Sequence, residues 1–600
     1  MNDPINSLNV SDEAKKRIFE WTNPPYDEEC INEIKSLVEN KAESELQDRF
    51  YTDLDFGTGG LRGVLGFGTN RMNIYTVKKA TQGLCNYINT QVKENPSIAV
   101  AYDSRNYSRE FAQTVAQVAA GNGIKCYLFE SMRPTPVLSF AILHLKASSG
   151  VVITASHNPP EYNGYKAYWS DGVQVTSPHD KAIIQEAKNV KSINNVKTLD
   201  MDDVKEKGLC EIIGTQMDRK YLDAIGKLVI NPEAIKQTKD DVKIVYTSLH
   251  GAGIKLIPQA FAQAGFNEPV MVDEQIIPDG NFPTVNYPNP EEKEALTLAI
   301  KKAEETGAEL VLATDPDADR MGAVYRDNEG NYILLNGNEI GSIMTYYILS
   351  ELKKKDRLPQ NGAIVKTIVT TDLQNKIAES FNIKVFEVLT GFKHIGSIIH
   401  KCLQDNSYRF LYGGEESYGY LNGDHARDKD GVSACILMAE ICHFLKARKQ
   451  TLGDYLVEIY AKNGYYKESL ISIVRKGEQG VKQISSLMGY FRKNLPVEIN
   501  QKKIIKIHDC LEGYSFYTDN PGEKTPLDLP KSNVLQFYLE DGSKISMRPS
   551  GTEPKVKFYF SCTLPVSTHS TFSKKDVLDN LKNYEDSFIK MINEVLDTFS

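Results

Sequence analysis

The sequence predicts a multidomain α/β protein whose last part is α+β. Its 600 residues exceed what a single hydrophobic core usually serves, so about three to five domains are expected. Short apolar segments alternate with helical patterns along most of the chain, and each is followed by a loop rich in polar side chains, which is typical of α/β units. Beyond about residue 465, alternating strands with a hairpin signal replace this pattern.

The composition excludes several classes of protein. A net charge of −9 gives no basic surface for nucleic acid or an anionic membrane. The polar start lacks the apolar segment of a secretion signal, and no run approaches the roughly 18 apolar residues of a membrane span. Nine scattered cysteines without Cys-x-x-Cys spacing indicate free thiols, so a cytoplasmic protein is expected.

The first expected domain covers residues 1–210. It starts with a charged, helix-patterned extension over about 11–49, which Asn23-Pro24-Pro25 breaks into segments. A βαβ unit follows, with a strand that starts at Ser97, a helix over about 109–121 and a strand over 125–129. The boundary is placed in the charged region before residue 210.

A serine loop follows a buried strand of this domain. Val151-Val152-Ile153 is apolar and β-branched, and Asn158-Pro159-Pro160 cannot continue a strand or start a regular helix at once. Ser156 is therefore expected on a sharp exposed loop, at the strand end where open α/β sheets place ligand chemistry. A hydrolase dyad with His157 is disfavoured, because adjacent residues rarely point a ring at the neighbouring hydroxyl.

The second expected domain, 211–335, opens with a strand at 242–246 and ends after an acidic loop, Asp315-Pro316-Asp317-Ala318-Asp319-Arg320. A calcium-binding EF-hand would need Gly at position six and Glu at position twelve of this loop, but the chain has Arg320 and Arg326 there. Three carboxylates at alternate positions in a tight loop suit Mg²⁺, with phosphate oxygens as further ligands. A solvated acidic turn is the alternative.

The third and fourth expected domains cover 336–465 and 466–600. The third carries Gly414-Glu415-Glu416-Ser417-Tyr418-Gly419 after an apolar run. In the fourth, strands over 534–539 and 544–547 flank Asp541-Gly542, which predicts a hairpin in an antiparallel sheet, and a helix is expected from about Lys574. Between two strands lies Arg548-Pro549-Ser550-Gly551-Thr552-Glu553-Pro554, whose guanidinium, hydroxyls and glycine suit a dianionic phosphate.

The four motifs around Ser156, Asp317, Glu415 and Arg548, in this order and over most of the chain, resemble those of the α-D-phosphohexomutase family of phosphoglucomutases and phosphomannomutases. The resemblance implies four domains around a central cleft, three of them similar mixed α/β sheet domains. It also implies that Ser156 carries a phosphoryl group and donates it. One Mg²⁺ would be held by this group and by Asp315, Asp317 and Asp319.

The resemblance assigns further roles. Arg62, in the glycine-rich loop 56–63, would face the phosphoserine, and His157 would orient the phosphate. Lys166 would take the proton of the sugar hydroxyl, which requires a pKa lowered by Arg62, Arg320 and the metal. The implied sugar-binding residues are Lys366, Thr390, Gly391, Lys393, Glu415 and Ser417, and the implied distal phosphate site consists of Arg548, Ser550, Gly551 and Thr552.

The implied reaction interconverts glucose 1-phosphate and glucose 6-phosphate through glucose 1,6-bisphosphate, which turns end for end. Phosphomannomutase and phosphopentomutase activities are alternatives, because the stretch Asp428–Ser433 looks like the branch that includes pentose-phosphate mutases. A metal-dependent phosphatase with Ser156 as nucleophile and a non-catalytic sugar-phosphate sensor are rival classes. The expected partner is a hexose phosphate, without nucleic acid or membrane, and the chain is expected to be a monomer or weak homodimer.

Overall fold

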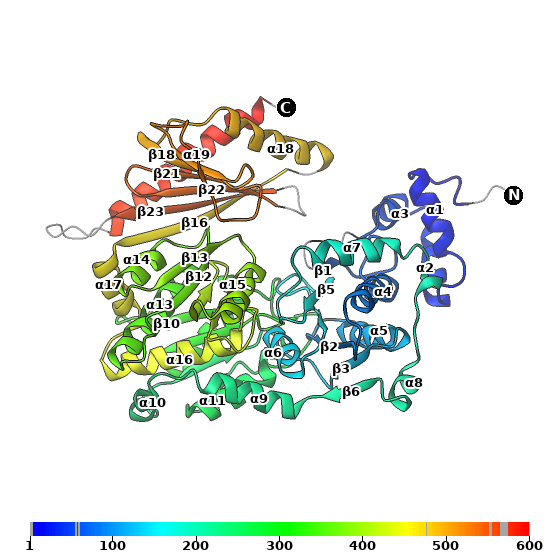
Figure 1. Cartoon of the computed structure of the whole chain (residues 1–600), viewed down its shortest axis with the longest axis horizontal. Helices are drawn as coiled ribbons and strands as arrows, with labels where there is room; N and C mark the ends of the chain where they lie inside the picture. Colours follow the sequence, from blue (N-terminus) through cyan, green and yellow to red (C-terminus); the bar gives the residue numbers. More distant parts are fainter. Residues whose placement is uncertain are drawn as a thin grey trace. The chain divides into compact units, whose positions relative to one another are not determined.

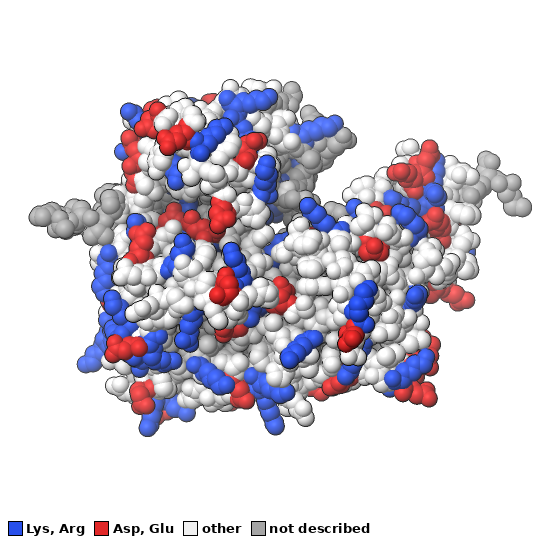
Figure 2. Space-filling view, in the orientation of Figure 1, with Lys and Arg blue, Asp and Glu red and all other residues white. Residues whose placement is uncertain are grey.

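The computed structural model describes residues 4–54, 57, 60–475, 477–550, 555–564 and 574–598 (Figure 1). The chain forms two compact units. The first consists of Met1–Leu335, Ile395–Gly413 and Ser417–Thr451, and the second of Asn336–His394, Gly414–Glu416 and Leu452–Ser600. In the described part of the chain, no helix has the length and apolar character needed to cross a membrane. Basic and acidic side chains are interspersed on the face drawn in Figure 2.

Three helices form the N-terminal extension of the first unit, α1 (Asp12–Trp21), α2 (Glu28–Glu39) and α3 (Glu43–Phe50). The side chains of Ser11 and Asp27 cap α1 and α2 by accepting hydrogen bonds from first-turn amides. An apolar cluster that includes Ile18, Trp21 and Phe50 holds the helices together. The predicted helical extension is confirmed, and so is the break between its first two helices.

Six strands form the first mixed sheet, in the order β1-β5-β4-β2-β3-β6. They are β1 (Gly60–Val64), β2 (Ser97–Tyr102), β3 (Lys125–Phe129), β4 (Ser149–Ile153), β5 (Tyr162–Trp169) and β6 (Cys210–Ile213). The central strands β2 and β4 run parallel and are buried along their whole length, because they are apolar on both faces. Since β6 pairs with β3, this sheet extends past the predicted boundary at residue 210.

Helices cover this sheet. They are α4 (Ile74–Gln91), α5 (Ser108–Gly121), α6 (Thr135–Leu145), α7 (His179–Asn189) and α8 (Met201–Glu206). Helix α5 packs on β2 and β3, and α6 packs on β2 and β4 (Figure 1). The predicted βαβ unit of β2, α5 and β3 is therefore confirmed.

The second mixed sheet has the order β11-β10-β9-β7-β8. Its strands are β7 (Ile244–Thr247), β8 (Val270–Met271), β9 (Leu310–Thr314), β10 (Met321–Arg326) and β11 (Tyr332–Leu334). Because β10 runs antiparallel to β9, residues 315–320 form a tight connection between neighbouring strands. The helices of this region are α9 (Thr215–Gly226), α10 (Pro232–Thr238), α11 (Ile257–Ala264) and α12 (Thr297–Thr306).

The third domain region contributes to both units. Parallel strands β12 (Gly362–Thr367) and β13 (Lys384–Val388) lie in the second unit. Strands β14 (Arg409–Gly414) and β15 (Tyr420–Asn422) neighbour each other in a sheet. The helices here are α13 (Gly337–Lys354), α14 (Leu373–Ser380), α15 (Phe392–Asp405), α16 (Gly431–Ala447) and α17 (Leu452–Asn463). Helix α16 packs on β9 and β10 within the first unit.

An antiparallel sheet dominates the end of the chain, as predicted. Its main strands are β16 (Tyr465–Val474), β18 (Lys502–Asp509), β19 (Tyr514–Tyr517), β21 (Leu535–Leu539), β22 (Lys544–Pro549) and β23 (Lys555–Leu564), with short β17 (Glu498–Ile499) and β20 (Thr525–Pro526). Strands β21 and β22 form the predicted hairpin, and its turn residue Gly542 has a φ of +88°. Helices α18 (Gly477–Lys493) and α19 (Lys574–Asp597) pack on β23.

Candidate active site

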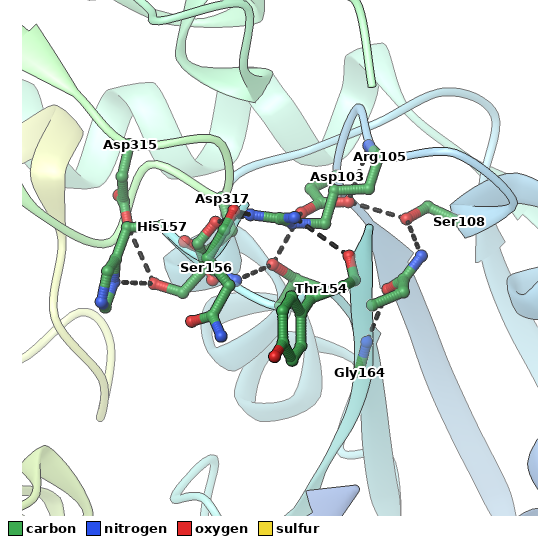
Figure 3. A network of polar contacts seen from close by, with 12 residues as sticks. Asp103, Arg105, Ser108, Thr154, Ser156, His157, Gly164, Asp315 and Asp317 are labelled. Carbon is green, nitrogen blue, oxygen red and sulfur yellow. Dashed lines mark hydrogen bonds and ion pairs between the residues drawn. The ribbon is translucent and has the colours of Figure 1, made fainter. Parts of the chain in front are cut away.

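Ser156 lies in the loop after β4 with its backbone in the left-handed region, at a φ of +53°. Residues other than glycine rarely adopt this conformation, and strain of this kind clusters at functional sites. The hydroxyl donates a 2.8 Å hydrogen bond to Asp315 Oδ2 (Figure 3). The predicted loop position is confirmed, but the residue is buried rather than exposed, because the aspartate loop covers it.

The ring of His157 lies beside Ser156, although adjacent residues were expected to point apart. His157 Nδ1 is 3.2 Å from Ser156 Oγ (Figure 3), so this expectation is wrong. The sharp turn at Ser156 permits the approach. Burial lowers the pKa of His157 well below its ordinary value, and the charges of Arg320 and Arg62 lower it further. The ring is therefore neutral near pH 7.

A buried arginine holds the serine loop in place. The guanidinium of Arg105 donates to four loop carbonyl oxygens, those of Ser156 and Asn158 at 2.5 Å, Pro159 at 2.8 Å and Tyr162 at 3.0 Å. Asp103 pairs with Arg105 at 3.2 Å and accepts from Thr154 Oγ1 at 2.7 Å, and that oxygen in turn accepts from the amide of Ser156 (Figure 3). The position of Ser156 thus depends on a network that begins at the end of β2.

The three predicted aspartates converge. Asp315, Asp317 and Asp319 are at most 1% exposed, and one carboxylate oxygen of each lies within 4.8 Å of those of the other two. Thr135, at the start of α6, holds Asp317, because its amide donates to the Asp317 carbonyl at 2.8 Å and its hydroxyl donates to Oδ2 at 3.1 Å. The amide of Arg320 donates to Asp315 Oδ1 at 3.0 Å.

These aspartates form a donor set that fits a hard divalent cation. Asp317 Oδ1 and Asp319 Oδ1 are buried and have no hydrogen-bond partner among the described residues. Buried polar atoms without partners are costly. Burial, reinforced by the charges of Asp317 and Asp319, raises the pKa of Asp315 well above its ordinary value. A cation with oxygen ligands would satisfy both oxygens and compensate the crowded negative charge.

Two lysines face the aspartates. Lys166 Nζ lies 2.9 Å from Asp317 Oδ2 and 3.4 Å from Asp319 Oδ2, while Lys429 Nζ lies 2.9 Å from Asp319 Oδ2. Burial lowers the pKa of Lys166, but the two carboxylates outweigh burial and raise it above its ordinary value. The lowered pKa expected from the sequence was attributed to Arg62, Arg320 and a bound metal, whereas the nearest charges of the protein itself are carboxylates.

The two predicted arginines lie close to the serine loop. Arg62, on β1, donates to Asn158 Oδ1 at 3.1 Å. Arg320 Nη1 donates to Glu291 Oε1 at 2.7 Å, and its Nε is 4.0 Å from Asp319 Oδ1. The first unit thus brings together the predicted catalytic and metal-binding residues Ser156, His157, Lys166, Arg62, Arg320, Asp315, Asp317 and Asp319.

Two of the predicted sugar-binding residues of the second unit, Gly391 and Glu415, are in contact, and Glu415 is largely buried. Glu415 Oε1 accepts from the amide of Gly391 at 2.8 Å. Gly391 has a φ of +113°, which residues with a side chain rarely adopt. Thr390 and Lys393 lie on either side of Gly391 in the sequence. Ser417 follows Glu415 by two positions but belongs to the first unit.

Lys366 does not match its expected role as a basic contact of the substrate. The side chain is fully buried, and Nζ lies 2.9 Å from Asp372 Oδ1 and 2.8 Å from Glu387 Oε1. It also donates to the carbonyl of Thr370 at 3.1 Å. Since three protein oxygens already surround the ammonium group, this geometry makes Lys366 part of an internal ionic cluster.

The predicted distal phosphate site lies at the end of β22. Arg548 is half-buried there. Burial lowers the pKa of His394 to about 4, and the charges of Lys393 and Arg548 contribute to the shift. These two cations therefore lie close enough to His394 to create a positive environment. Ser550 follows directly after the strand, whereas Gly551 and Thr552 lie outside the described residues.

Sequence reasoning missed several residues of this site, namely Asp103, Arg105, Thr135 and Lys429. Lys429 lies in a polar run just before α16, and Asp430 caps that helix by accepting from the amides of Val432 and Ser433. A charged residue beside a helix cap was the available signal. The sequence alone linked the polar run around Lys429 only to one branch of the family, and not to the site.

Family profiles match most of the first three domain regions. Those described as phosphoglucomutase/phosphomannomutase α/β/α domains I, II and III match residues 53–194, 219–330 and 336–463. Together they cover more than half of the chain. Each matched range lies inside one of the first three predicted domains, although the boundaries themselves remain a prediction.

Relatives and solved structures agree with these profiles. The phosphoglucomutase of Staphylococcus haemolyticus (strain JCSC1435) is 37% identical over 531 residues, which are 88% of this chain and 94% of the relative. The phosphoglucomutase of Staphylococcus aureus (strain MRSA252) is 35% identical over 537 residues, 89% and 94% of the two chains.

Two solved structures share the fold. Parafusin (pp63), a phosphoglucomutase from Paramecium in its open form, has a TM-score of 0.65 at 19% identity, over 92% of this chain and 96% of that chain. A phosphoglucomutase/phosphomannomutase family protein from Burkholderia thailandensis has a TM-score of 0.61 at 19% identity, over 90% and 97% of the chains. The chain therefore belongs to the phosphoglucomutase/phosphomannomutase family of α-D-phosphohexomutases, which are isomerases.

Proposed function

We propose that the chain is a phosphoglucomutase that interconverts glucose 1-phosphate and glucose 6-phosphate through a phosphoserine at Ser156. The observation that carries the proposal is the 2.8 Å contact of Ser156 Oγ with Asp315, inside a buried cluster of three aspartates. Such a cluster next to a hydroxyl suits phosphoryl transfer, in which positioning and charge compensation supply most of the catalysis. The names of the relatives support glucose as the sugar.

Asp315, Asp317 and Asp319, together with the phosphoryl group on Ser156, would hold one Mg²⁺. When bound, the cation would withdraw charge from the phosphoryl group and compensate the carboxylates that raise the pKa of Lys166. Thr135 would keep Asp317 oriented through its two hydrogen bonds. The unpartnered oxygens of Asp317 and Asp319 support this assignment.

Lys166 is proposed to accept the proton of the attacking sugar hydroxyl, because it is the predicted base and lies at the aspartate cluster. Lys429 lies at the same cluster and is positioned to share this work. In the first transfer the bond from phosphorus to Ser156 Oγ breaks and a bond from phosphorus to the sugar oxygen forms. The neutral amine of the lysine would take the proton of the sugar hydroxyl, and a proton would return to Ser156 Oγ, which becomes the hydroxyl that donates to Asp315. Neutral His157, 3.2 Å from Oγ, would orient the phosphoryl group.

The product of this transfer would be glucose 1,6-bisphosphate. Arg548 and Ser550 are proposed to hold the phosphate that does not react, and Glu415 and Ser417 to bind sugar hydroxyls. After the intermediate turns end for end, the other phosphate would be transferred back to Ser156, and the isomeric monophosphate would leave. The phosphate-binding residues and the sugar-binding residues would thus each serve both orientations of the sugar.

The choice of sugar gives the first test. We expect glucose 1-phosphate to be preferred over mannose 1-phosphate by at least about tenfold in kcat/KM, and over ribose 1-phosphate by a similar or larger margin. A pentose would leave Glu415 partly unpaired, which costs about 1–3 kcal/mol. A coupled assay with the three sugar 1-phosphates measures this directly. Equal or reversed preference would assign the chain to phosphomannomutase or phosphopentomutase activity on the same mechanism.

The distal phosphate gives the second test. Arg548→Ala removes a charge-assisted contact worth roughly 1.5–3 kcal/mol, so kcat/KM should fall about ten- to a hundredfold. Most of the loss should appear in KM, because this phosphate is bound in the ground and transition states alike. Lys503→Ala, an exposed position on the same sheet, serves as the control. A large loss of kcat at unchanged KM would place Arg548 at the reacting phosphate instead.

A further inference from the structure

Four charged side chains form an ionic cluster in the second unit, in which two buried lysines pair with two partly exposed carboxylates. Asp372 accepts from two lysines: Oδ1 lies 2.9 Å from Lys366 Nζ, and Oδ2 lies 2.9 Å from Lys544 Nζ. Glu387 Oε1 lies 2.8 Å from Lys366 Nζ. Lys366 and Lys544 are 0% and 3% exposed, so neither ammonium group can turn to solvent. The cluster balances two positive against two negative charges.

Burying the two ammonium groups is costly unless each of them is paired. Burial raises the pKa of Asp372, yet Lys366 and Lys544 outweigh burial and hold it below its ordinary value. Both ammonium groups also donate to backbone carbonyls, Lys366 to Thr370 at 3.1 Å and Lys544 to Ile368 at 3.2 Å. The segment between β12 and α14 supplies Asp372 and both carbonyls, so every contact of the cluster except that of Glu387 on β13 involves this segment.

On one side, this cluster is connected to the predicted phosphate site. Lys544 is the first residue of β22, and Arg548 is four residues further along the same strand. Because side chains in a strand alternate between faces, Lys544, Ser546 and Arg548 share one face. Ser546 accepts from Gln536 Nε2 at 2.8 Å, and the same amide group donates to Ile368 O at 2.9 Å. The face of β22 that carries Arg548 is thus fastened to residues 368–372.

On the other side, the same segment contacts the predicted sugar-binding loop. Thr367 Oγ1 and Thr370 Oγ1 each lie 3.2 Å from Glu416 Oε2. Glu415, the adjacent residue, accepts from Gly391 at 2.8 Å. An apolar cluster that includes Ile368 and Tyr559 packs beside these contacts. Residues 367–372 are therefore bonded both to the sugar loop and to the strand that carries Arg548.

From these contacts we infer that Lys544, through Asp372, is a positioning residue that fixes the distal phosphate site relative to the sugar-binding loop. The inference rests on the proposed function for the roles of Arg548 and Glu415. A sugar phosphate has a fixed distance between its hydroxyls and its phosphate, so substrate binding requires both groups at a set separation. The ammonium group of Lys544 is engaged by Asp372 and by the carbonyl of Ile368, so Lys544 would act through the strand rather than by binding substrate.

Lys544→Met is the direct test, because it removes the link and leaves Lys366 paired with Asp372 and Glu387. We expect KM for glucose 1-phosphate to rise about tenfold, with kcat within about threefold, since misplacement of a binding group by about 1 Å can cost up to about a hundredfold. Lys376→Met is the matched control. That lysine is exposed on α14, and within the described residues its only ion pair is with Glu379 at 2.9 Å. KM should not change in this variant.

A double-mutant cycle separates positioning from general destabilisation. If Lys544 acts by placing Arg548, then Lys544→Met should change KM less than twofold in the Arg548→Ala background. A full tenfold change in that background, or an unchanged KM in the single variant, would overturn the inference.

Hydrogen exchange gives a readout that does not depend on activity. The amides of residues 367–371 should exchange faster in Lys544→Met than in wild type or Lys376→Met, because the segment loses its bonds to β22. Unchanged exchange there would also overturn the inference. A wild-type enzyme without mutase activity would refute the proposed function instead. The exchange result would still test whether Lys544 holds residues 367–372 against β22.

Discussion

Replacement of Ser156 by alanine is expected to lower mutase turnover by at least about a thousandfold, because the proposed covalent phosphoryl carrier is lost. The hydroxyl is within 2.8 Å of Asp315 and 3.2 Å of His157, and the described residues around it place no second serine or threonine hydroxyl in contact with both. The fold should persist. Arg105 and Thr154 hold the loop through its main chain, and alanine keeps those bonds.

Two measurements check this expectation. Peptide mass spectrometry of active wild-type enzyme should place a phosphoryl group on Ser156, and the coupled assay should show loss of turnover in Ser156→Ala. Ser170→Ala, at an exposed position after β5, is the control and should retain full activity and its phosphoserine. An active Ser156→Ala enzyme, or wild-type phosphate found only on another residue, would contradict the phosphoserine mechanism.

The loops that carry the chemistry could be predicted because local signals specify them. Ser156 and the aspartates each follow a short apolar strand, and a strand end is where polar loop residues gather. The hairpin around Asp541-Gly542 has a turn that only a few residue types form, so sequence alone located it. The alternation of apolar strands and helical patterns likewise predicted α/β units, whereas the mixed sheets were implied by the family resemblance.

What could not be predicted depends on pairing and packing that no local sequence pattern specifies. Lys366 was expected at the substrate, but its side chain is buried and pairs with Asp372 and Glu387. The four-residue strand β6 has a weak pattern and was cut off from its sheet by the predicted boundary. The direction in which the pKa of Lys166 shifts could not be predicted, because the carboxylates that raise this pKa lie about 150 positions away in the sequence.

Asp317→Asn is expected to lower turnover by at least about a hundredfold, since metal ligation contributes several kcal/mol and each 1.36 kcal/mol is tenfold in rate. Asp317 Oδ1 is buried and has no hydrogen-bond partner among the described residues, which makes it the best candidate for direct coordination. An amide is close in size and keeps an oxygen that can accept from Thr135 and Lys166. The loss should therefore reflect the missing charge rather than a disrupted loop.

A structural role and a metal-binding role differ in their response to Mg²⁺. In wild type, Mg²⁺ should raise the melting temperature, because a ligand at a hundred times its Kd stabilises the folded state by about 2.7 kcal/mol. In Asp317→Asn this shift should vanish at the same Mg²⁺ concentration, and activation should require far more Mg²⁺. Asp327→Asn, just after β10, should behave as wild type, because its partly exposed side chain accepts hydrogen bonds only within a local turn among the described residues. Full activity of the wild type after exhaustive dialysis against EDTA would show that the aspartates do not act through a metal. Their convergence would then have a structural role only.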